Sequence, residues 1–359
     1  MQYNYRIDSD AARGPEKLRR SARDPFYPDN PSMQLSPKAI GISAAVVTIL
    51  IWTLFIVVAR FMALKSLTPL DIVFCRLVGA SLVLLPWGFW MVRKMRAADP
   101  AKSANLETPL GLSPLPWRVM WVIGAFGGVA YAVLAYSAFV YAPASHGSVL
   151  LPGMLPLSTA LLSVLLLGER LSSGRLLGLG LILCGGLLVG GASLLKAFDG
   201  GEVWKGDLLF VCASTTWAFY TVTCRKHALA AVPATIALVV FAAFTYLPVY
   251  GLLVALGLVS SKLASAPLGE VAFQVLWQGM GSVVISGIAF TKMVQYFGPI
   301  RSTMLTAIVP GLSAICAVIF LHEPLYWNLI AGLALVTVGI VVGVCAAAKT
   351  PMPIAAKPA

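Results

Sequence analysis

Ten long apolar runs, separated by short polar segments, constrain this chain more than any other feature of its sequence. A helix that crosses a bilayer needs about 20 mostly apolar residues, because no water is present there to satisfy its backbone polar groups. Of the 359 residues, 59% are hydrophobic and 11% are charged. We therefore predict an all-α polytopic membrane protein with ten transmembrane helices. The predicted spans are 40–62, 71–92, 118–141, 147–167, 175–195, 206–226, 233–256, 271–296, 301–321 and 326–347.

The basic residues predict the orientation. A formal net charge of +12 could indicate nucleic-acid binding, but cytoplasmic segments of membrane proteins are themselves enriched in Lys and Arg. We expect no nucleic-acid partner, an inner (plasma) membrane location and both termini in the cytoplasm. Residues 1–39 are predicted to be a disordered cytoplasmic tail, and residues 348–359 form a second cytoplasmic tail. In this orientation the basic residues on the outer side are Arg60, Lys65, Lys196, Lys205 and Lys262.

Two sequence offsets align the first half of the chain with the second, and the predicted repeats are 40–196 and 206–347. Because each copy holds five helices, an odd number, the second copy must enter the membrane from the opposite side. Inverted repeats are typical of secondary transporters, which bind substrate near the midplane. An offset of 154 pairs Pro156 with Pro310, Glu169 with Glu323, Gly178 with Gly332 and Gly185 with Gly339, and an offset of 165 pairs Gly41 with Gly206, Trp52 with Trp217 and Arg60 with Arg225.

Short motifs recur between the last two helices of each copy, as Leu167-Gly168-Glu169-Arg170-Leu171 and Leu321-His322-Glu323-Pro324-Leu325. Further motifs are Pro69-Leu70 to Arg76, Thr216-Trp217-Ala218-Phe219-Tyr220 to Arg225-Lys226, and Gly298-Pro299-Ile300-Arg301 to Pro310. In this order the motifs resemble the EamA family of the drug/metabolite transporter superfamily. The resemblance runs from about residue 40 to residue 347. It implies a carrier for small metabolites, and amino-acid and metabolite efflux are common among such relatives.

Matched prolines and tryptophans indicate a central site. Pro156 and Pro310 are expected near the middle of the fourth and ninth helices, where each removes a backbone donor and clashes with a carbonyl group. Such matched breaks can mark a binding site, although a packing kink gives the same pattern. Trp52 and Trp217 occupy midspan, outside the interfacial belt where tryptophan collects. We expect them to face each other across the pseudo-twofold axis, with simple helix packing as the alternative.

Hydroxyl and basic groups complete the predicted site, although serine also joins membrane helices to one another. Arg76 and Lys292 are the basic residues within predicted helices, and we expect both to extend to the interface. Lys292 is the better candidate for the site, because its helix is long enough to slide. The predicted substrate-binding residues are Thr48, Trp52, Tyr131, Pro156, Ser214, Trp217, Tyr220, Ser282, Ser286, Lys292 and Pro310.

The acidic residues are all expected in tails, loops or helix ends, so a conventional intramembrane proton relay is not predicted. Facilitated transport, exchange, or coupling through Glu169 or Glu323 stays open. Each of these glutamates precedes a helix, where the helix dipole favours a carboxylate, and a structural turn is the simpler interpretation. Gly186 and Gly190, matched by Gly339 and Gly343, form small-residue faces for close helix packing, which includes a homodimer contact as an option.

The sequence contains neither a Gly-rich phosphate loop ending in Gly-Lys-Ser/Thr nor a metal-type spacing of His and Cys. We therefore expect no cofactor, no metal and no ATP-driven pumping. An intramembrane enzyme would need clustered acid and base groups at midspan, and none is predicted, so catalytic residues are not expected. The predicted partners are a small-molecule substrate and the lipid bilayer. A non-transporting receptor or scaffold and a carrier for a phosphorylated or nucleotide-type substrate are the alternative functions.

Overall fold

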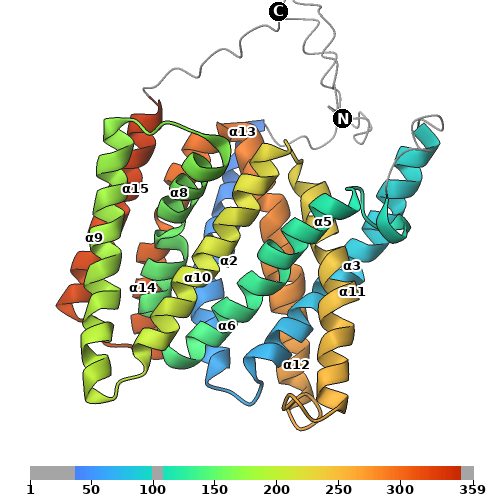
Figure 1. Ribbon diagram of the computed structural model, residues 1–359, viewed down its shortest axis with the longest axis horizontal. Helices are drawn as coiled ribbons and strands as arrows, with labels where there is room; N and C mark the ends of the chain where they lie inside the picture. Colours follow the sequence, from blue (N-terminus) through green and yellow to red (C-terminus); the bar gives the residue numbers. More distant parts are fainter. Residues whose placement is uncertain (1–36, 99–107, 349–359) are drawn as a thin grey trace, which may run out of the picture.

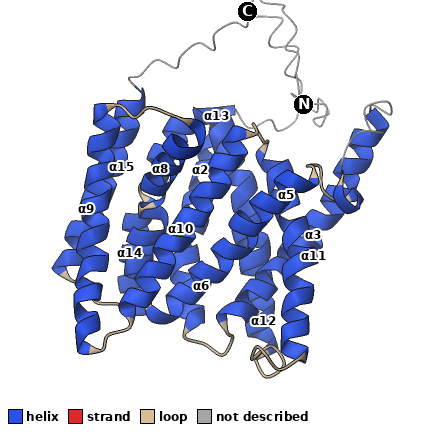
Figure 2. Ribbon diagram, viewed as in Figure 1, coloured by secondary structure: helices blue, strands red, loops and turns tan. Residues whose placement is uncertain are grey.

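The computed structural model describes residues 37–98 and 108–348, and the regular elements in these ranges are all helices. Eight helical segments are long and apolar enough to cross a membrane, and Val309–Leu321 is a shorter apolar helix. The helices stand side by side in one bundle (Figure 1), with short loops at both ends and no strand in the described part (Figure 2). The predicted all-α membrane class is confirmed. Most of the N-terminal tail and the C-terminal tail lie outside the described residues.

The first half contains five apolar segments, of which two are built from several short pieces. α2 (Pro37–Ala63) and α3 (Pro69–Ala98) come first, and the 3-10 turn η1 (Pro109–Gly111) follows. The third segment joins α5 (Trp117–Ile123), the π-helix η2 (Gly124–Ala130) and α6 (Tyr131–Tyr141). The fourth joins α7 (Ala144–Ser148), the π-helix η3 (Val149–Gly153) and α8 (Leu155–Leu167). α9 (Ser173–Leu195) and the 3-10 turn η4 (Lys196–Asp199) complete this half.

The second half begins with α10 (Val203–Lys226) and α11 (Ala231–Ala255). The next segment joins α12 (Leu268–Gln274), the π-helix η5 (Val275–Ile285) and α13 (Ser286–Thr306), and α14 (Val309–Leu321) and α15 (Trp327–Ala348) follow. One predicted boundary is wrong, because the helices expected at 271–296 and 301–321 do not divide between 296 and 301. Instead, α13 continues through Thr306, and the next helix begins at Val309.

Pro156 and Pro310 begin helices, which corrects the prediction that they interrupt them. Each is the second residue of its helix, α8 and α14. In the first turn of a helix a backbone N–H has no intrahelical acceptor, so proline costs no hydrogen bond there. The matched interruption itself is present, since η3 and Met154 precede α8 and a turn at 307–308 precedes α14. The prolines therefore restart a helix after an irregular stretch in both halves.

Glycine allows the helices of the two halves to pack closely. A Cβ atom built at Gly185 would lie 2.5 Å from the carbonyl oxygen of Gly332, and one built at Gly178 would lie 2.6 Å from that of Gly339. The sequence offset pairs Gly178 with Gly332 and Gly185 with Gly339, so each glycine packs against the counterpart of the other. Such reciprocal contacts are the mark of a twofold axis, here between α9 and α15 within one chain.

The repeated helices α2 and α10 run in opposite directions. The end of α2 lies beside the end of α6, because Arg60 donates a hydrogen bond to the carbonyl oxygen of Phe139. The beginning of α10 lies at this same end of the bundle, where a Cβ atom at Gly206 would be 2.5 Å from the Ala142 side chain. Figure 1 shows α10 rising from the edge of the bundle at which α2 ends.

Candidate substrate site

Arg76 is buried in the bundle, with only 8% of its surface exposed. Arg76 is covered because the backbones of α3 and η5 lie in contact close to it. A Cβ atom at Gly79, one turn after Arg76, would lie 2.0 Å from the Val275 carbonyl oxygen. About 10 Å of helix separates Arg76 from the start of α3 at Pro69. The prediction that Arg76 extends to the membrane interface is therefore wrong, because its helix packs too closely against η5.

Polar side chains from two other elements meet this guanidinium group. Arg76 Nη1 donates to the hydroxyl of Tyr136 over 3.2 Å and to Oγ of Ser282 over 3.0 Å. The Tyr136 hydroxyl in turn donates to Oε1 of Gln278 over 2.7 Å. Gln278 and Ser282 lie one turn apart on η5, which follows the 7 residues of α12 in the apolar segment Leu268–Phe290. We call Arg76, Tyr136, Gln278 and Ser282 the Arg76 cluster.

Several polar side-chain atoms near the start of η5 have no protein partner. Nε2 of Gln278, both polar side-chain atoms of Gln274 and Nε1 of Trp277 are buried without a hydrogen bond, and both glutamines are fully buried. Within residues 37–98 and 108–348, no carboxylate pairs with Arg76. Unpaired buried polar groups are costly and are rare in native structures. A substrate group that brings a negative charge and hydrogen-bond acceptors would pair with Arg76 and satisfy the amide N–H donors of Gln278.

Aromatic rings border the Arg76 cluster. The rings of Tyr131 and Trp217 lie 4.7 Å apart between centroids, and those of Trp217 and Tyr220 lie 4.9 Å apart. Tyr131 lies on α6, the helix that also carries Tyr136 of the cluster. Arg76 also lies 5.9 Å from the centre of the Phe55 ring. The candidate site is therefore cationic on one side and aromatic on the other.

The predicted site residues divide into two sets. Tyr131, Trp217 and Tyr220 form one group of rings. Ser282 contacts Arg76, and Ser286 donates a hydrogen bond to the Ser282 carbonyl oxygen one turn away. The other predicted residues lie in different surroundings. Trp52 stacks on Phe290, the Thr48 hydroxyl donates to the Ala44 carbonyl oxygen, and the Ser214 hydroxyl is buried without a hydrogen-bond partner. Lys292 is half-buried on α13, and Pro156 and Pro310 lie at the starts of α8 and α14.

Trp52 and Trp217 do not form the expected facing pair. The Trp52 ring stacks on Phe290 of α13, with centroids 5.2 Å apart, whereas Trp217 packs against Tyr131 of α6. The reason is the packing order of the helices, because α2 lies against α13 and α10 lies against α6. Each tryptophan therefore faces a helix of the opposite half.

Gln274, Gln278 and Tyr136 are candidate site residues that the sequence analysis did not include. A usable signal was present for the glutamines, because two amides four residues apart on one helix face are unusual in an apolar run. Tyr136 gave no such signal, since a tyrosine in a membrane helix is more often a packing residue. Its position became clear only from its contacts with α3 and η5.

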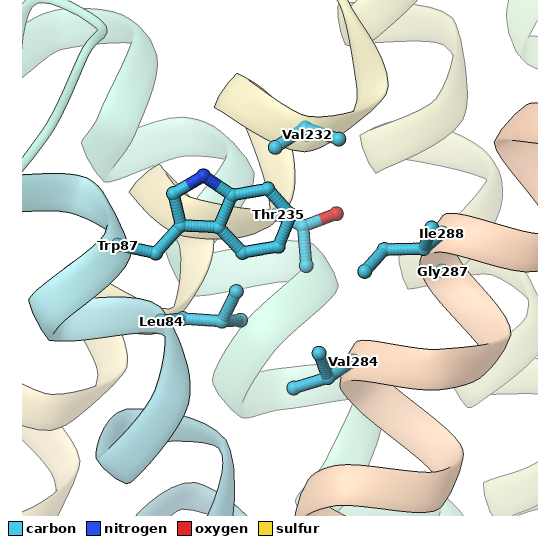
Figure 3. A pocket seen from close by; sticks show the side chains of 7 residues that line it. All are labelled: Leu84, Trp87, Val232, Thr235, Val284, Gly287 and Ile288. Atoms are coloured by element: carbon cyan, nitrogen blue, oxygen red, sulfur yellow. The ribbon is translucent and has the colours of Figure 1, made fainter. Parts of the chain in front are cut away.

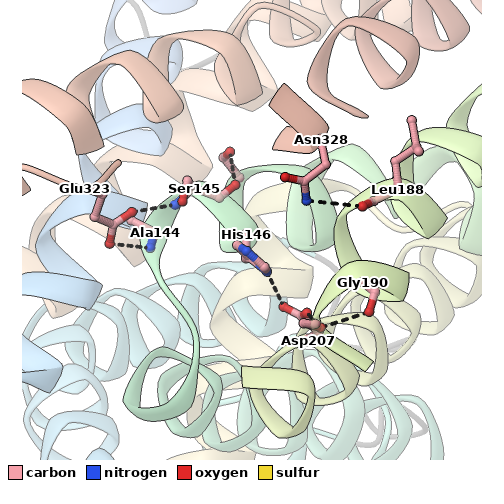
Figure 4. A network of polar contacts seen from close by, with 10 residues as sticks. Ala144, Ser145, His146, Leu188, Gly190, Asp207, Glu323 and Asn328 are labelled. Atoms are coloured by element: carbon pink, nitrogen blue, oxygen red, sulfur yellow. Dashed lines mark hydrogen bonds and ion pairs between the residues drawn. The ribbon is translucent and has the colours of Figure 1, made fainter. Parts of the chain in front are cut away.

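A second polar network lies where α2, α6 and α14 end. Glu323 accepts hydrogen bonds from the backbone N–H groups of Ala144 and Ser145, at 2.8 and 3.0 Å (Figure 4). Its Oε1 lies 3.6 Å from Nε of Arg60. Glu323 was expected to interact with the N-terminus of the helix that follows it. This expectation is wrong, because its carboxylate binds the backbone N–H groups at the start of α7. At the other end of the bundle, its counterpart Glu169 pairs with Arg225.

His146 forms a buried pair with Asp207 next to this network. Nδ1 of His146 lies 2.9 Å from Oδ1 of Asp207, and Ser193 donates a hydrogen bond to the same carboxylate (Figure 4). Both residues are over nine-tenths buried. The pair joins α7 to the beginning of α10 and so fastens the fourth segment of one half to the first helix of the other. Within the described part, no group of His, Cys, Asp and Glu could hold a metal ion.

A small apolar cavity between α3, α11 and the η5–α13 segment is separate from the Arg76 cluster. Leu84, Trp87 and Val284 are among its lining residues (Figure 3). Its volume is about 10 Å³, which leaves room for no more than about one water molecule. This cavity is therefore too small for a metabolite.

Comparison with known proteins agrees with this architecture. The model of the EamA-like transporter family matches residues 39–191 and 204–344. A solved structure titled "Crystal structure of protein" is 22% identical, with a TM-score of 0.50, and the match covers 87% of this chain and 98% of that one. At this identity the likeness shows the fold alone. No curated protein matches. Because the family model covers two copies that span most of the chain, the protein belongs to the EamA-like transporter family of multi-pass membrane transporters.

Proposed function

We propose that this protein is a secondary carrier for a small zwitterionic metabolite, such as an amino acid, and that the substrate carboxylate binds Arg76. The observation that carries this proposal is the buried guanidinium group without a carboxylate partner in the described part of the chain. A buried charge requires a partner, and a substrate carboxylate would supply one by accepting from Arg76. The neighbouring rings of Tyr131 and Trp217 suit a substrate ammonium group, because aromatic faces attract cations.

The topology that we propose has ten membrane crossings in two inverted repeats of five, 40–196 and 206–347. The opposite directions of α2 and α10 and the reciprocal glycine contacts of α9 and α15 support it. α10 counts as a crossing because it has 24 residues and its charged residues lie near its two ends. The excess of basic residues on one side supports cytoplasmic termini in an inner membrane. We further propose efflux as the direction of transport.

Alternating access in this carrier would use two matched ion pairs. Arg60 with Glu323 and Arg225 with Glu169 are exchanged by the sequence offsets, and each pair joins one half to the other. The Arg60–Glu323 pair is the more buried, with side-chain exposures of 18% and 10% against 50% and 28%. This difference supports a state that is closed at the Arg60 end. Opening that end would break the Arg60–Glu323 pair, whereas the Arg225–Glu169 pair at the other end is already formed and could stay closed.

Exchange and facilitated transport remain the mechanisms that we favour. The Arg76 cluster contains no carboxylate that could carry a proton at the substrate site. A carrier for phosphorylated sugars or nucleotides finds less support, because the single positive charge of Arg76 would not neutralise a phosphate group that carries two negative charges. The rings and amides around Arg76 suit a single carboxylate better.

A ligand series tests the proposal. The purified chain is screened for melting temperature against the common amino acids, because a ligand that binds only the folded state raises the melting temperature. The best ligand is then compared with its methyl ester, which lacks the carboxylate, and with its decarboxylated amine. We expect stabilisation and counterflow in proteoliposomes for the acid alone. Equal binding of the acid and the amine would contradict a role for Arg76 in carboxylate recognition.

A further inference from the structure

A cavity of about 280 Å³ opens between the beginning of α5 and the ends of α8 and α10. Arg118, Lys226 and His227 line it on one side, and all three are exposed. The residues that line it include no acid. The nearby Arg225 differs, because it is already paired with Glu169. Two permanent positive charges therefore share one concave surface without a neutralising partner among the lining residues.

The opposite wall of the cavity is apolar. It is formed by the aromatic ring of Phe219 and by the aliphatic side chains of Val119, Val122, Leu166 and Val222. Leu166 is 41% exposed, and the Phe219 ring contacts Phe126, which is 38% exposed, with centroids 4.4 Å apart. In a protein embedded in a bilayer, exposed apolar side chains along a crossing helix contact acyl chains. The cavity thus continues onto the lipid-facing surface of the bundle.

The depth of the cavity corresponds to the level of the lipid head groups. α5 begins at Trp117, α8 ends at Leu167 and α10 ends at Lys226, so three helices begin or end at this level. Trp117 and Trp121 on α5 are 44% and 52% exposed. Tryptophan on a membrane helix prefers the boundary between hydrocarbon and water, which agrees with this placement.

We propose that this cavity binds the phosphate group of an anionic glycerophospholipid. Arg118 and Lys226 would contact the phosphate, and the acyl chains would lie along Leu166 and Phe219. Basic pockets between membrane helices at the head-group level suit such lipids, because the charge and the apolar wall serve the two parts of one molecule. A soluble phosphate would use only the charged half. The site is distinct from the Arg76 cluster and does not depend on the transported substrate.

The test uses the full chain, purified and delipidated in a neutral detergent. Its melting temperature and its lipid adducts in native mass spectrometry are measured with phosphatidylglycerol and with phosphatidylcholine of the same acyl chains. We expect phosphatidylglycerol to stabilise the chain more, with an effect that weakens at high salt. The R118Q/K226Q variant should bind phosphatidylglycerol about tenfold or more weakly.

A matched control removes the same charge from the same end of the bundle. Arg93 and Arg170 are exposed and lie outside the cavity, so the R93Q/R170Q variant should retain the binding of phosphatidylglycerol. If R118Q/K226Q does not fold, Val122→Trp keeps both cations, fills the apolar wall and should also lower the number of bound lipids. Equal binding by the two charge variants would overturn the proposal, as would equal stabilisation by the two lipids. Stabilisation by glycerol phosphate equal to that by the lipid would overturn it as well, in favour of a soluble anion.

Discussion

The Tyr136 hydroxyl donates a 2.7 Å hydrogen bond to the side-chain oxygen of Gln278. This bond joins α6 of the first half to η5 of the second, and the same hydroxyl accepts from Arg76 of α3. Three elements from both halves thus meet at one oxygen atom. If one half moves relative to the other, the hydrogen bond between Tyr136 and Gln278 must break or the two side chains must move together. The geometry of the Arg76 cluster is therefore expected to change during alternating access.

Gln278→Glu is expected to stabilise the protein and inhibit it. A carboxylate at this position would lie close to the Arg76 guanidinium group and would replace the substrate carboxylate as its partner. We expect a higher melting temperature and at least about a tenfold loss of counterflow, the equivalent of about 1.4 kcal/mol. Gln278→Leu serves as the comparison, since it removes the amide without adding a charge. Unimpaired transport by Gln278→Glu would exclude a substrate carboxylate at Arg76.

Arg76→Lys should weaken substrate binding although it preserves the charge. The planar guanidinium group can present two parallel donors to a carboxylate, and a lysine ammonium group cannot. A lost hydrogen bond to a charged group costs about 1.5–3 kcal/mol, so we expect the half-saturating substrate concentration to rise about 10- to 100-fold. Arg93→Lys, on the exposed end of α3, should leave transport unchanged. Normal affinity in Arg76→Lys would indicate that Arg76 only packs or orders the helices.

Glu323→Gln should destabilise the chain more than Glu169→Gln. The Glu323 carboxylate accepts two backbone hydrogen bonds and lies beside Arg60 in a largely buried position. Removal of its charge is expected to cost about 1–3 kcal/mol, whereas an exposed pair such as Glu169–Arg225 contributes at most about 1 kcal/mol. Thermal unfolding of both variants measures the difference. Equal losses of unfolding free energy in the two variants would contradict this prediction, because they would show that both glutamates contribute equally to stability.

Gly185→Ala and Gly190→Ala should have opposite effects. A methyl group at Gly185 would lie 2.5 Å from the Gly332 carbonyl oxygen, whereas nothing lies within 4 Å of one at Gly190. Overpacking costs about 1–3 kcal/mol, and alanine improves an open helix position by up to about 1 kcal/mol over glycine. Melting temperatures test the stability of each variant. Size-exclusion chromatography with light scattering tests whether the glycine face forms a homodimer contact. Loss of a dimer in Gly190→Ala would assign the open glycine face to the partner subunit.

The sequence offsets identified which positions of the two halves are equivalent but not which residues are in contact. They paired Arg60 with Arg225 and Glu169 with Glu323, and the structure joins each arginine to the glutamate of the other half. They also paired the glycines of α9 and α15, which pack reciprocally. An offset reveals which positions are equivalent, whereas a contact depends on how the two copies are placed around their axis.

The sequence by itself determined the membrane class, the two copies and the family, because a bilayer imposes length, polarity and charge rules that are visible residue by residue. Only the tertiary structure decided that Arg76 is buried, that Trp52 faces Phe290 and that Pro156 begins a helix. These outcomes depend on which helices are neighbours and on how closely they approach. The glycines at positions 79 and 279 bring α3 and η5 together, and with them the guanidinium group and the amides of the proposed substrate site.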